Sequence, residues 1–143
     1  MKKIFFAAIV VLALCVVPGV GWAETNVPYL DHEGKLQETE ADIEVKVLEN
    51  SGDFDEPLNA GWYIVRGDIP LTDMITIEDE VHLILEDDCH LQVTTIDEEA
   101  AILVNENDSL TIYAQSTDTN IGRLTAITTG TSEIGRASCR ERV

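Results

Sequence analysis

The chain has 143 residues, of which 27 are acidic and nine are basic, and its formal net charge is −18. Nucleic acids and anionic membrane surfaces recruit basic patches, so this composition argues against both classes of partner. A net charge far from zero instead favours solubility and self-repulsion.

A secretory signal peptide is predicted over residues 1–23. Lys2 and Lys3 precede an apolar run over residues 4–17, and small residues occupy Gly21 and Ala23, where signal peptidase reads the chain. The apolar run is shorter than the ~20 residues that a membrane-spanning helix needs. We therefore expect cleavage after Ala23, a protein that is secreted, extracellular or cell-wall attached, and no membrane insertion after cleavage.

Residues 24–60 are acidic and show little periodicity. Ile43, Val45 and Val47 alternate with Glu44 and Lys46, which predicts one strand with two different faces. We expect this segment to be an acidic leader or cap that covers the start of the fold behind it. A disordered spacer is the open alternative.

From Gly61 onward the pattern becomes that of short strands. Apolar residues alternate with polar ones, polar turns separate the runs, and no window has the spacing of a helix. The strands are expected around residues 62–65, 75–77, 81–85, 91–93, 110–114 and 124–126.

The same stretch contains an internal repeat. A shift of nineteen residues places Leu91 on Leu110, and a shift of twenty places Val65 on Leu85 and Leu71 on Leu91. A period near twenty is typical of a β-solenoid, in which each coil buries its apolar face only when another coil stacks on it. Residues 61–132 are therefore predicted to be the first coils of an all-β solenoid.

The last residues, 133–143, have a different composition. They read EIGRASCRERV and contain three arginines, whereas residues 24–132 contain only Arg66 and Arg123. Back-translated, they resemble a short-read sequencing adapter read in frame. We interpret them as a non-native tail, with a genuine basic tail as the alternative, and expect the natural protein to continue past Ser132.

Several stretches carry a resemblance to a known group of proteins. They are YLDHEGK, GWYIVRGDI, ITIEDEVHLILEDDCHLQV, NDSLTIYAQS and GRLTAI. Together, from Tyr29 to about Thr128, they resemble the opening of secreted bacterial proteins described as carbohydrate-binding-domain or adhesin-like. In that group, glycine-rich coils usually follow the LTA segment, and here the arginine-rich tail stands in their place.

The resemblance implies a fold and a function. It implies a right-handed parallel β-helix that serves as a binding or adhesion scaffold and contacts carbohydrate, or a host, matrix or cell-surface protein. The alternative is the front of a β-helix polysaccharide lyase or glycoside hydrolase whose catalytic coils lie beyond Ser132.

Acidic clusters are the first candidates for chemistry. Carboxylates on successive turns can hold Ca²⁺, which takes six to eight oxygen ligands, and the nineteen-residue shift would bring Glu86 near Asn105. Acidic turns are ordinarily solvated, however, so no cofactor is expected and Ca²⁺ stays the open alternative. The clusters are Glu78–Glu80, Glu86–Asp88, Asp97–Glu99, and Glu106 with Asp108.

No catalytic set is apparent in the sequence. His32, His82 and His90 are scattered without the spacing of metal ligands, and no nucleophile has a base and an orienting partner nearby. We expect no catalytic, metal-binding or cofactor-binding residues in this part of the protein, and the activity of a full-length protein stays open.

Three smaller features complete the list of candidates. Alternation sends one of Trp62 and Tyr63 inward, and we expect Trp62 in the core and an exposed Tyr63 as the candidate ligand contact. Residues 66–68 spell the cell-attachment tripeptide Arg-Gly-Asp, which a turn before a strand explains equally well. Cys89 is the only cysteine of residues 24–132, so that part of the chain has no intrachain disulfide.

Overall fold

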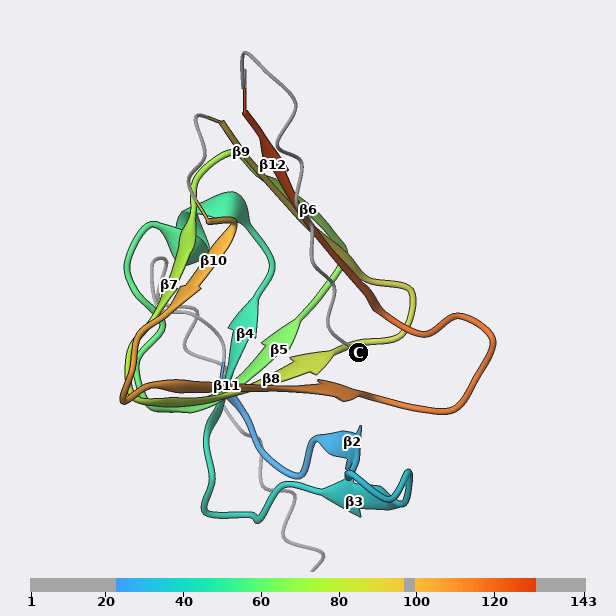
Figure 1. Cartoon of the computed structure of the whole chain (residues 1–143). Coiled ribbons are helices and arrows are strands. Elements are labelled where there is room, and N and C mark those ends of the chain that lie inside the picture. The colour runs from blue at the N-terminus through green and yellow to red at the C-terminus, as the bar shows by residue number, and fades with distance from the viewer. Residues whose placement is uncertain (1–22, 97–99, 131–143) are drawn as a thin grey trace, which may run out of the picture.

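The computed structural model describes residues 23–96 and 100–130 (Figure 1). The predicted signal peptide up to residue 22 and the arginine-rich tail lie outside the described residues. The described chain consists mostly of strands, with a single 3-10 turn, η1 (Ser51–Phe54), so the all-β prediction is confirmed. Nowhere in this part of the chain is there a helix with the length and apolar character needed to cross a membrane.

The largest sheet has five strands in the order β1-β4-β5-β8-β11. The short strand β1 runs antiparallel to β4, and every other pair in this sheet is parallel. The strands are β1 (Ala23–Glu24), β4 (Val45–Leu48), β5 (Gly61–Val65), β8 (Glu80–Leu85) and β11 (Ser109–Ala114).

Between successive strands of the large sheet, the chain forms the strands of two smaller parallel sheets. In order along the chain, β5 is followed by β6 and β7, and β8 is followed by β9 and β10. The three parallel sheets lie along the sides of a triangle in Figure 1. The smaller sheets contain β6 (Asp68–Leu71), β9 (His90–Ile96) and β12 (Arg123–Thr129), and β7 (Ile75–Ile77) with β10 (Ile102–Val104).

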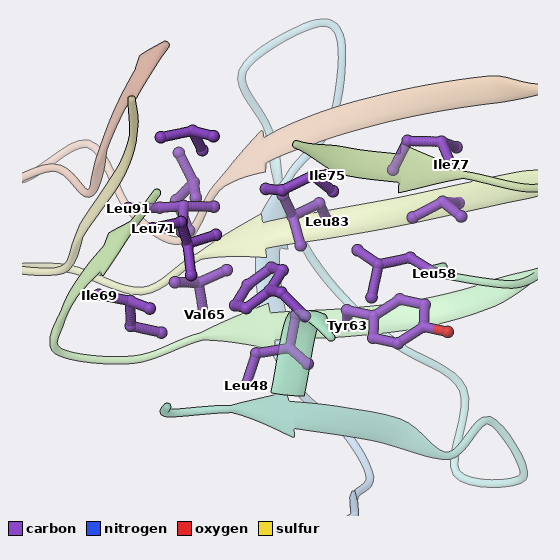
Figure 2. Close-up of a cluster of buried hydrophobic side chains, with 14 of the residues drawn as sticks. Leu48, Leu58, Tyr63, Val65, Ile69, Leu71, Ile75, Ile77, Leu83 and Leu91 are labelled. Carbon is purple, nitrogen blue, oxygen red and sulfur yellow. The ribbon is translucent and has the colours of Figure 1, made fainter. Parts of the chain in front are cut away.

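The main core fills the space that these sheets enclose (Figure 2). Side chains of one parity point inward from each strand, as expected for strands whose successive residues face opposite sides. Tyr63 and Val65 from β5 stack on Leu83 and Leu85 from β8, because Tyr63 pairs with Leu83 and Val65 with Leu85. Phe54 from η1 adds an aromatic ring to this core.

A second apolar cluster lies on the other face of the large sheet. It joins Val45 and Val47 of β4 to Ile64 and Ile84, and Val27 from the N-terminal segment packs against them. Val45 and Val47 are buried while Lys46 is exposed, so the predicted two-faced strand is confirmed. The antiparallel hairpin of β2 (Pro28–Leu30) and β3 (Leu36–Glu38) belongs to the same N-terminal segment.

The pairing registers test the predicted repeat. Val65 pairs with Leu85, which confirms the shift of twenty at that point. Leu91 pairs with Ile69 and not with Leu71, and Leu110 pairs with Val81 and not with Leu91, so the remaining predicted alignments are wrong.

The corners between the strands explain this drift in register. The corner after β5 consists of residues 66–67 and the equivalent corner after β8 of residues 86–89, so Leu91 pairs with Ile69 at a shift of 22. The turn before β8 consists of residues 78–79 and that before β11 of residues 105–108, which adds to the shift of 29 between Val81 and Leu110. The corner after β11, residues 115–122, is the longest of the three. Each added residue lengthens the interval between stacked strands, yet it leaves the inward and outward parity of the strands unchanged. A fixed period therefore cannot describe the chain.

The longest corner packs closely on the one beneath it. The Asp88 N–H donates to the Asn120 carbonyl at 2.7 Å, and the Arg123 N–H donates to the Cys89 carbonyl at 2.8 Å. A Cβ on Gly122 would lie 2.4 Å from the carbonyl oxygen of Glu86 and 2.9 Å from the sulfur of Cys89. Glycine is therefore required at this position by the close approach of two corners.

We expect Gly122→Ala to destabilise the fold by about 1–3 kcal/mol, the usual cost of overpacking a tight site. Thermal unfolding followed by circular dichroism measures the effect. Gly52→Ala is the matched control, because its Cβ would meet only a carboxylate oxygen of Asp55 at 3.7 Å. Equal melting temperatures for Gly122→Ala and the unaltered protein would contradict the described packing of the corners.

Candidate functional site

Four aromatic side chains gather on the outer face of the large sheet. Trp62 of β5 and His82 of β8 are direct register partners. Tyr113 of β11 has the same outward parity, because its neighbour Ile112 pairs with the inward Leu83. Tyr29 of β2 brings a fourth ring from the N-terminal hairpin. We call these four residues the aromatic cluster.

The rings of the aromatic cluster are in mutual contact. The Trp62 and His82 centroids lie 4.4 Å apart with 12° between the planes, and the Trp62 and Tyr113 centroids lie 5.3 Å apart with 17°. Tyr29 meets Trp62 and Tyr113 at tilted angles, with both centroid distances at 5.0 Å. Stacked and edge-on pairs of this kind are the arrangements that aromatic quadrupoles favour.

Three polar side-chain groups contact one another in series along one side of the aromatic cluster. His82 Nδ1 lies 2.9 Å from the Tyr113 hydroxyl, and His82 Nε2 lies 3.2 Å from Glu80 Oε1. Burial raises the pKa of Tyr113, so its hydroxyl keeps its proton at neutral pH. When His82 is neutral, one arrangement of protons satisfies all three groups. The Tyr113 hydroxyl then donates to His82 Nδ1, and His82 Nε2–H donates to the Glu80 carboxylate.

This arrangement offers apolar ring surface beside hydrogen-bonding groups. Trp62, His82 and Tyr113 are each partly exposed, and the Glu80 side chain is 71% exposed. Aromatic surface with a few polar groups at its margin is the usual composition of a small-molecule binding site. The aromatic cluster is therefore the strongest candidate site among the described residues.

Tyr63 lies elsewhere, on the inner face of the same strand. Its ring is 4% exposed and its hydroxyl donates to the Asn59 carbonyl at 2.9 Å, whereas Trp62 is the outward neighbour. The predicted orientation of the two rings is therefore wrong. Tyr63 helps to line a depression of about 450 Å³ beside β4, where Lys46 Nζ lies 5.3 Å from its ring centroid. A ligand contact by Tyr63 stays a prediction, limited to this depression.

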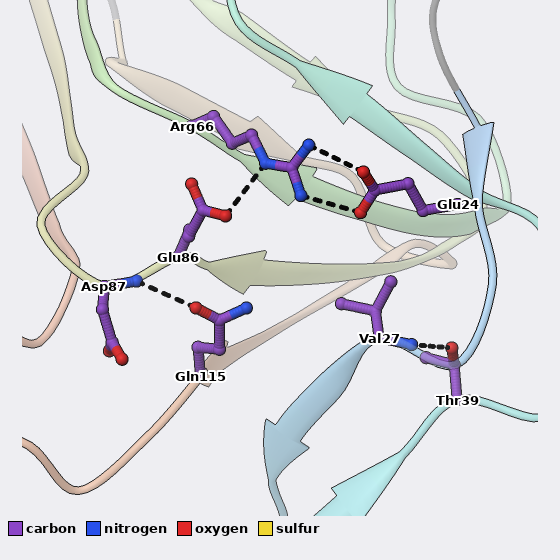
Figure 3. Close-up of polar contacts among 7 residues, drawn as sticks. All are labelled: Glu24, Val27, Thr39, Arg66, Glu86, Asp87 and Gln115. Carbon is purple, nitrogen blue, oxygen red and sulfur yellow. Dashed lines mark hydrogen bonds and ion pairs between the residues drawn. The ribbon is translucent and has the colours of Figure 1, made fainter.

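Arg66 connects β1 to a corner of the large sheet (Figure 3). Its guanidinium donates two hydrogen bonds to the Glu24 carboxylate at 2.7 and 2.8 Å, and its Nε donates to Glu86 Oε1 at 2.9 Å. Hydrogen bonds and charge from these carboxylates raise the pKa of Arg66, and Arg66 in turn lowers the pKa of Glu24. Because both edges of the guanidinium are occupied, a structural role explains Arg66 better than the cell-attachment tripeptide does.

The acidic turns do not align as the nineteen-residue shift predicted. Glu86 does not stack near Asn105, and the turn at Asp79 instead lies against the turn that ends at Asp108. Asp108 accepts hydrogen bonds there from the Asp79 N–H at 2.9 Å and from the Asn105 side chain at 3.1 Å. Within residues 23–96 and 100–130, no three His, Cys, Asp or Glu side chains gather as metal ligands would. The cluster at residues 97–99 lies outside the described residues.

The remaining candidates are parts of the packing. Cys89 is buried, and burial raises the pKa of its thiol to about 11, so it is a poor nucleophile at neutral pH. His90 Nε2 lies 2.9 Å from the Thr125 hydroxyl on the neighbouring strand. Neither residue meets the aromatic cluster.

No protein-family model matches the chain, and neither a curated protein nor a solved structure matches it significantly. The geometry of the site therefore has to carry the functional assignment.

The sequence contained part of the signal for the aromatic cluster. Trp62 and His82 are separated by the same twenty residues as Val65 and Leu85, so the confirmed shift already makes them neighbours. Tyr113 could not be placed in this way, because the longer turns before β11 change the interval.

The ion pair of Glu24 and Arg66 predicts a dependence of stability on pH. Because the pKa of Glu24 is lower in the folded state, its contribution is present above its ordinary pKa near 4.5 and is lost as the pH falls through the lower folded value. Since Glu24 is partly exposed, we expect Glu24→Gln to cost at most about 1 kcal/mol at neutral pH.

Urea unfolding of the unaltered protein and of Glu24→Gln between pH 7 and pH 3 measures this contribution. The difference in free energy of unfolding between the two proteins should shrink as the pH falls. Both proteins also lose stability over this range because their other carboxylates become protonated. A difference that grows on acidification would contradict the assigned role of Glu24.

Proposed function

We propose that the chain is the opening of a right-handed parallel β-helix in a secreted or cell-surface protein. In this proposal the coils form a scaffold that binds carbohydrate and performs no chemistry of its own. The parallel pairing of β5, β8 and β11, and of β6, β9 and β12, supports the fold. The predicted signal peptide supports the location.

The aromatic cluster is the observation that carries the carbohydrate assignment. Sugars offer apolar C–H faces to aromatic rings and hydroxyl groups to polar neighbours, and Trp62 lies beside His82 and Tyr113 with Glu80 at the margin. Because the chain is strongly acidic, the ligand that fits best is a neutral glycan, since an acidic polysaccharide would be repelled.

A catalytic role for the aromatic cluster has less support. The contact between His82 and Tyr113 is its nearest approach to an acid–base pair, but burial raises the pKa of Tyr113 and so makes its phenolate harder to form. A general base works best with a pKa near the operating pH. The proposal therefore assigns this pair to hydrogen bonding with a ligand and not to lyase chemistry.

The test exploits the tryptophans of the chain. Trp22 and Trp62 are its two tryptophans, and cleavage after Ala23 would leave Trp62 as the single tryptophan, which can be excited selectively at the red edge of its absorption. Titration of the purified protein with neutral oligosaccharides, such as xylo-, cello-, manno- and chito-oligomers, should change its tryptophan emission. Calorimetry should then show a loss of affinity of at least about tenfold (1.4 kcal/mol) in Trp62→Ala and a smaller loss in Glu80→Gln.

His90→Gln is the control, because His90 lies in a different sheet from the aromatic cluster. It should keep the affinity of the unaltered protein. Binding that survives Trp62→Ala would place the glycan elsewhere, and an absence of binding across the panel would contradict the proposed function.

A further inference from the structure

The hairpin of β2 and β3 lies outside the triangle of parallel sheets, beside the outer face of the large sheet (Figure 1). Its two strands pair with each other, and within residues 23–96 and 100–130 no strand pairing joins them to the large sheet. All three residues of β3 are exposed, and Leu36 is 65% exposed. An isolated two-stranded hairpin has little stability of its own, so its position depends on its side-chain contacts.

Contacts at its base and at Tyr29 hold the hairpin in place. At the base, the Val27 N–H donates to the Thr39 hydroxyl at 2.9 Å and the Thr39 N–H donates to the Val27 carbonyl at 3.0 Å, and both residues are buried. Further along β2, the centroid of the Tyr29 ring lies 5.0 Å from that of Trp62 and 5.0 Å from that of Tyr113. The base is therefore fixed, while the body of the hairpin rests on the large sheet through the Tyr29 ring.

The turn of the hairpin is held by hydrogen bonds within the hairpin itself. One carboxylate oxygen of Asp31 accepts from the N–H groups of Glu33 and Lys35, both at 2.9 Å, and the other accepts from the Gln37 side chain at 2.9 Å. Gly34 completes the turn with a φ of 74°, which glycine adopts without steric cost. Because these bonds do not involve the large sheet, they stay intact when the hairpin moves about its base, so it can move as one unit.

The Tyr29 ring occupies aromatic surface on which a sugar would have to lie. Centroid distances of 5.0 Å are those of rings in direct contact, so no sugar ring fits between Tyr29 and Trp62 or between Tyr29 and Tyr113. In this position Tyr29 shields part of both rings from water. A ligand that stacks on the same surface must displace the Tyr29 ring first.

We propose that the β2–β3 hairpin is a lid, closed over the aromatic cluster by Tyr29 and opened when a ligand takes the place of the Tyr29 ring. The identity of that ligand as a neutral glycan rests on the proposed function, whereas the closure rests on the ring contacts of Tyr29. Because the closed lid excludes the ligand, the apparent affinity is the intrinsic affinity reduced by the fraction of molecules whose lid is open. Tyr29 is thus a residue that sets affinity by competing with the ligand.

Quenching of Trp62 fluorescence by acrylamide tests the lid without any ligand. Tyr29→Ala removes the closing ring, and Thr39→Val keeps that ring but removes a hydrogen bond at the base of the hairpin, so each should raise the quenching constant. Leu36→Ala is the matched control, because it removes an exposed apolar side chain from the same hairpin and should leave the quenching constant unchanged. Where Trp22 is retained, its emission is common to all these proteins, so the difference between them reports Trp62.

Calorimetry with the neutral oligosaccharides measures the effect of the lid on binding. Tyr29→Ala should lower the Kd at least about fivefold, because the loss of two aromatic contacts shifts the lid toward its open state, and Thr39→Val should lower it in the same direction. A Kd that is unchanged or higher in Tyr29→Ala would overturn the proposal, as would quenching that is unchanged in both variants. Increased quenching in both variants without glycan binding in any protein would uphold the lid and contradict the proposed function.

Discussion

The structure depends on the stacking of like side chains in parallel register. Because Tyr63 lies over Leu83 and Val65 over Leu85, each inward apolar column is continuous from strand to strand. Complete burial of such a side chain contributes about 1.5–3 kcal/mol. In the absence of a disulfide between residues 24 and 132, these columns provide the main stabilisation of the fold.

The same register determines which side chains lie next to each other on the outer face of the large sheet. When Tyr63 and Leu83 point inward, Trp62 and His82 must point outward and become neighbours, so the aromatic cluster is a consequence of the core pairing. The N-terminal segment then covers the rest of that face, with Val27 packed on the sheet and Glu24 held by Arg66. Burial of its apolar residues and the charge-assisted bonds of Glu24 offset the cost of ordering this acidic segment.

Alternation and turn chemistry were sufficient to predict an all-β chain and the pairing of Val65 with Leu85. They failed at Trp62 and Tyr63 because residues 62–65 are all apolar, so the local pattern does not show which parity is buried. The confirmed shift of twenty resolves this, because it pairs Trp62 with the polar His82 and Tyr63 with the apolar Leu83, so Tyr63 is the inward residue. The nineteen-residue alignment failed because the corners differ in length while the alternation within each strand stays the same. No local sequence pattern shows which corner stacks on which.

The register between β8 and β11 places Tyr113 in the aromatic cluster and Ile112 over the core residue Leu83. Nuclear Overhauser contacts between backbone protons of adjacent strands measure it directly in an isotope-labelled sample. We expect cross-strand contacts that place Leu110 beside Val81 and Tyr113 beside Ile84. Contacts that place Leu110 beside Leu91 would restore the nineteen-residue repeat and contradict the register between β8 and β11.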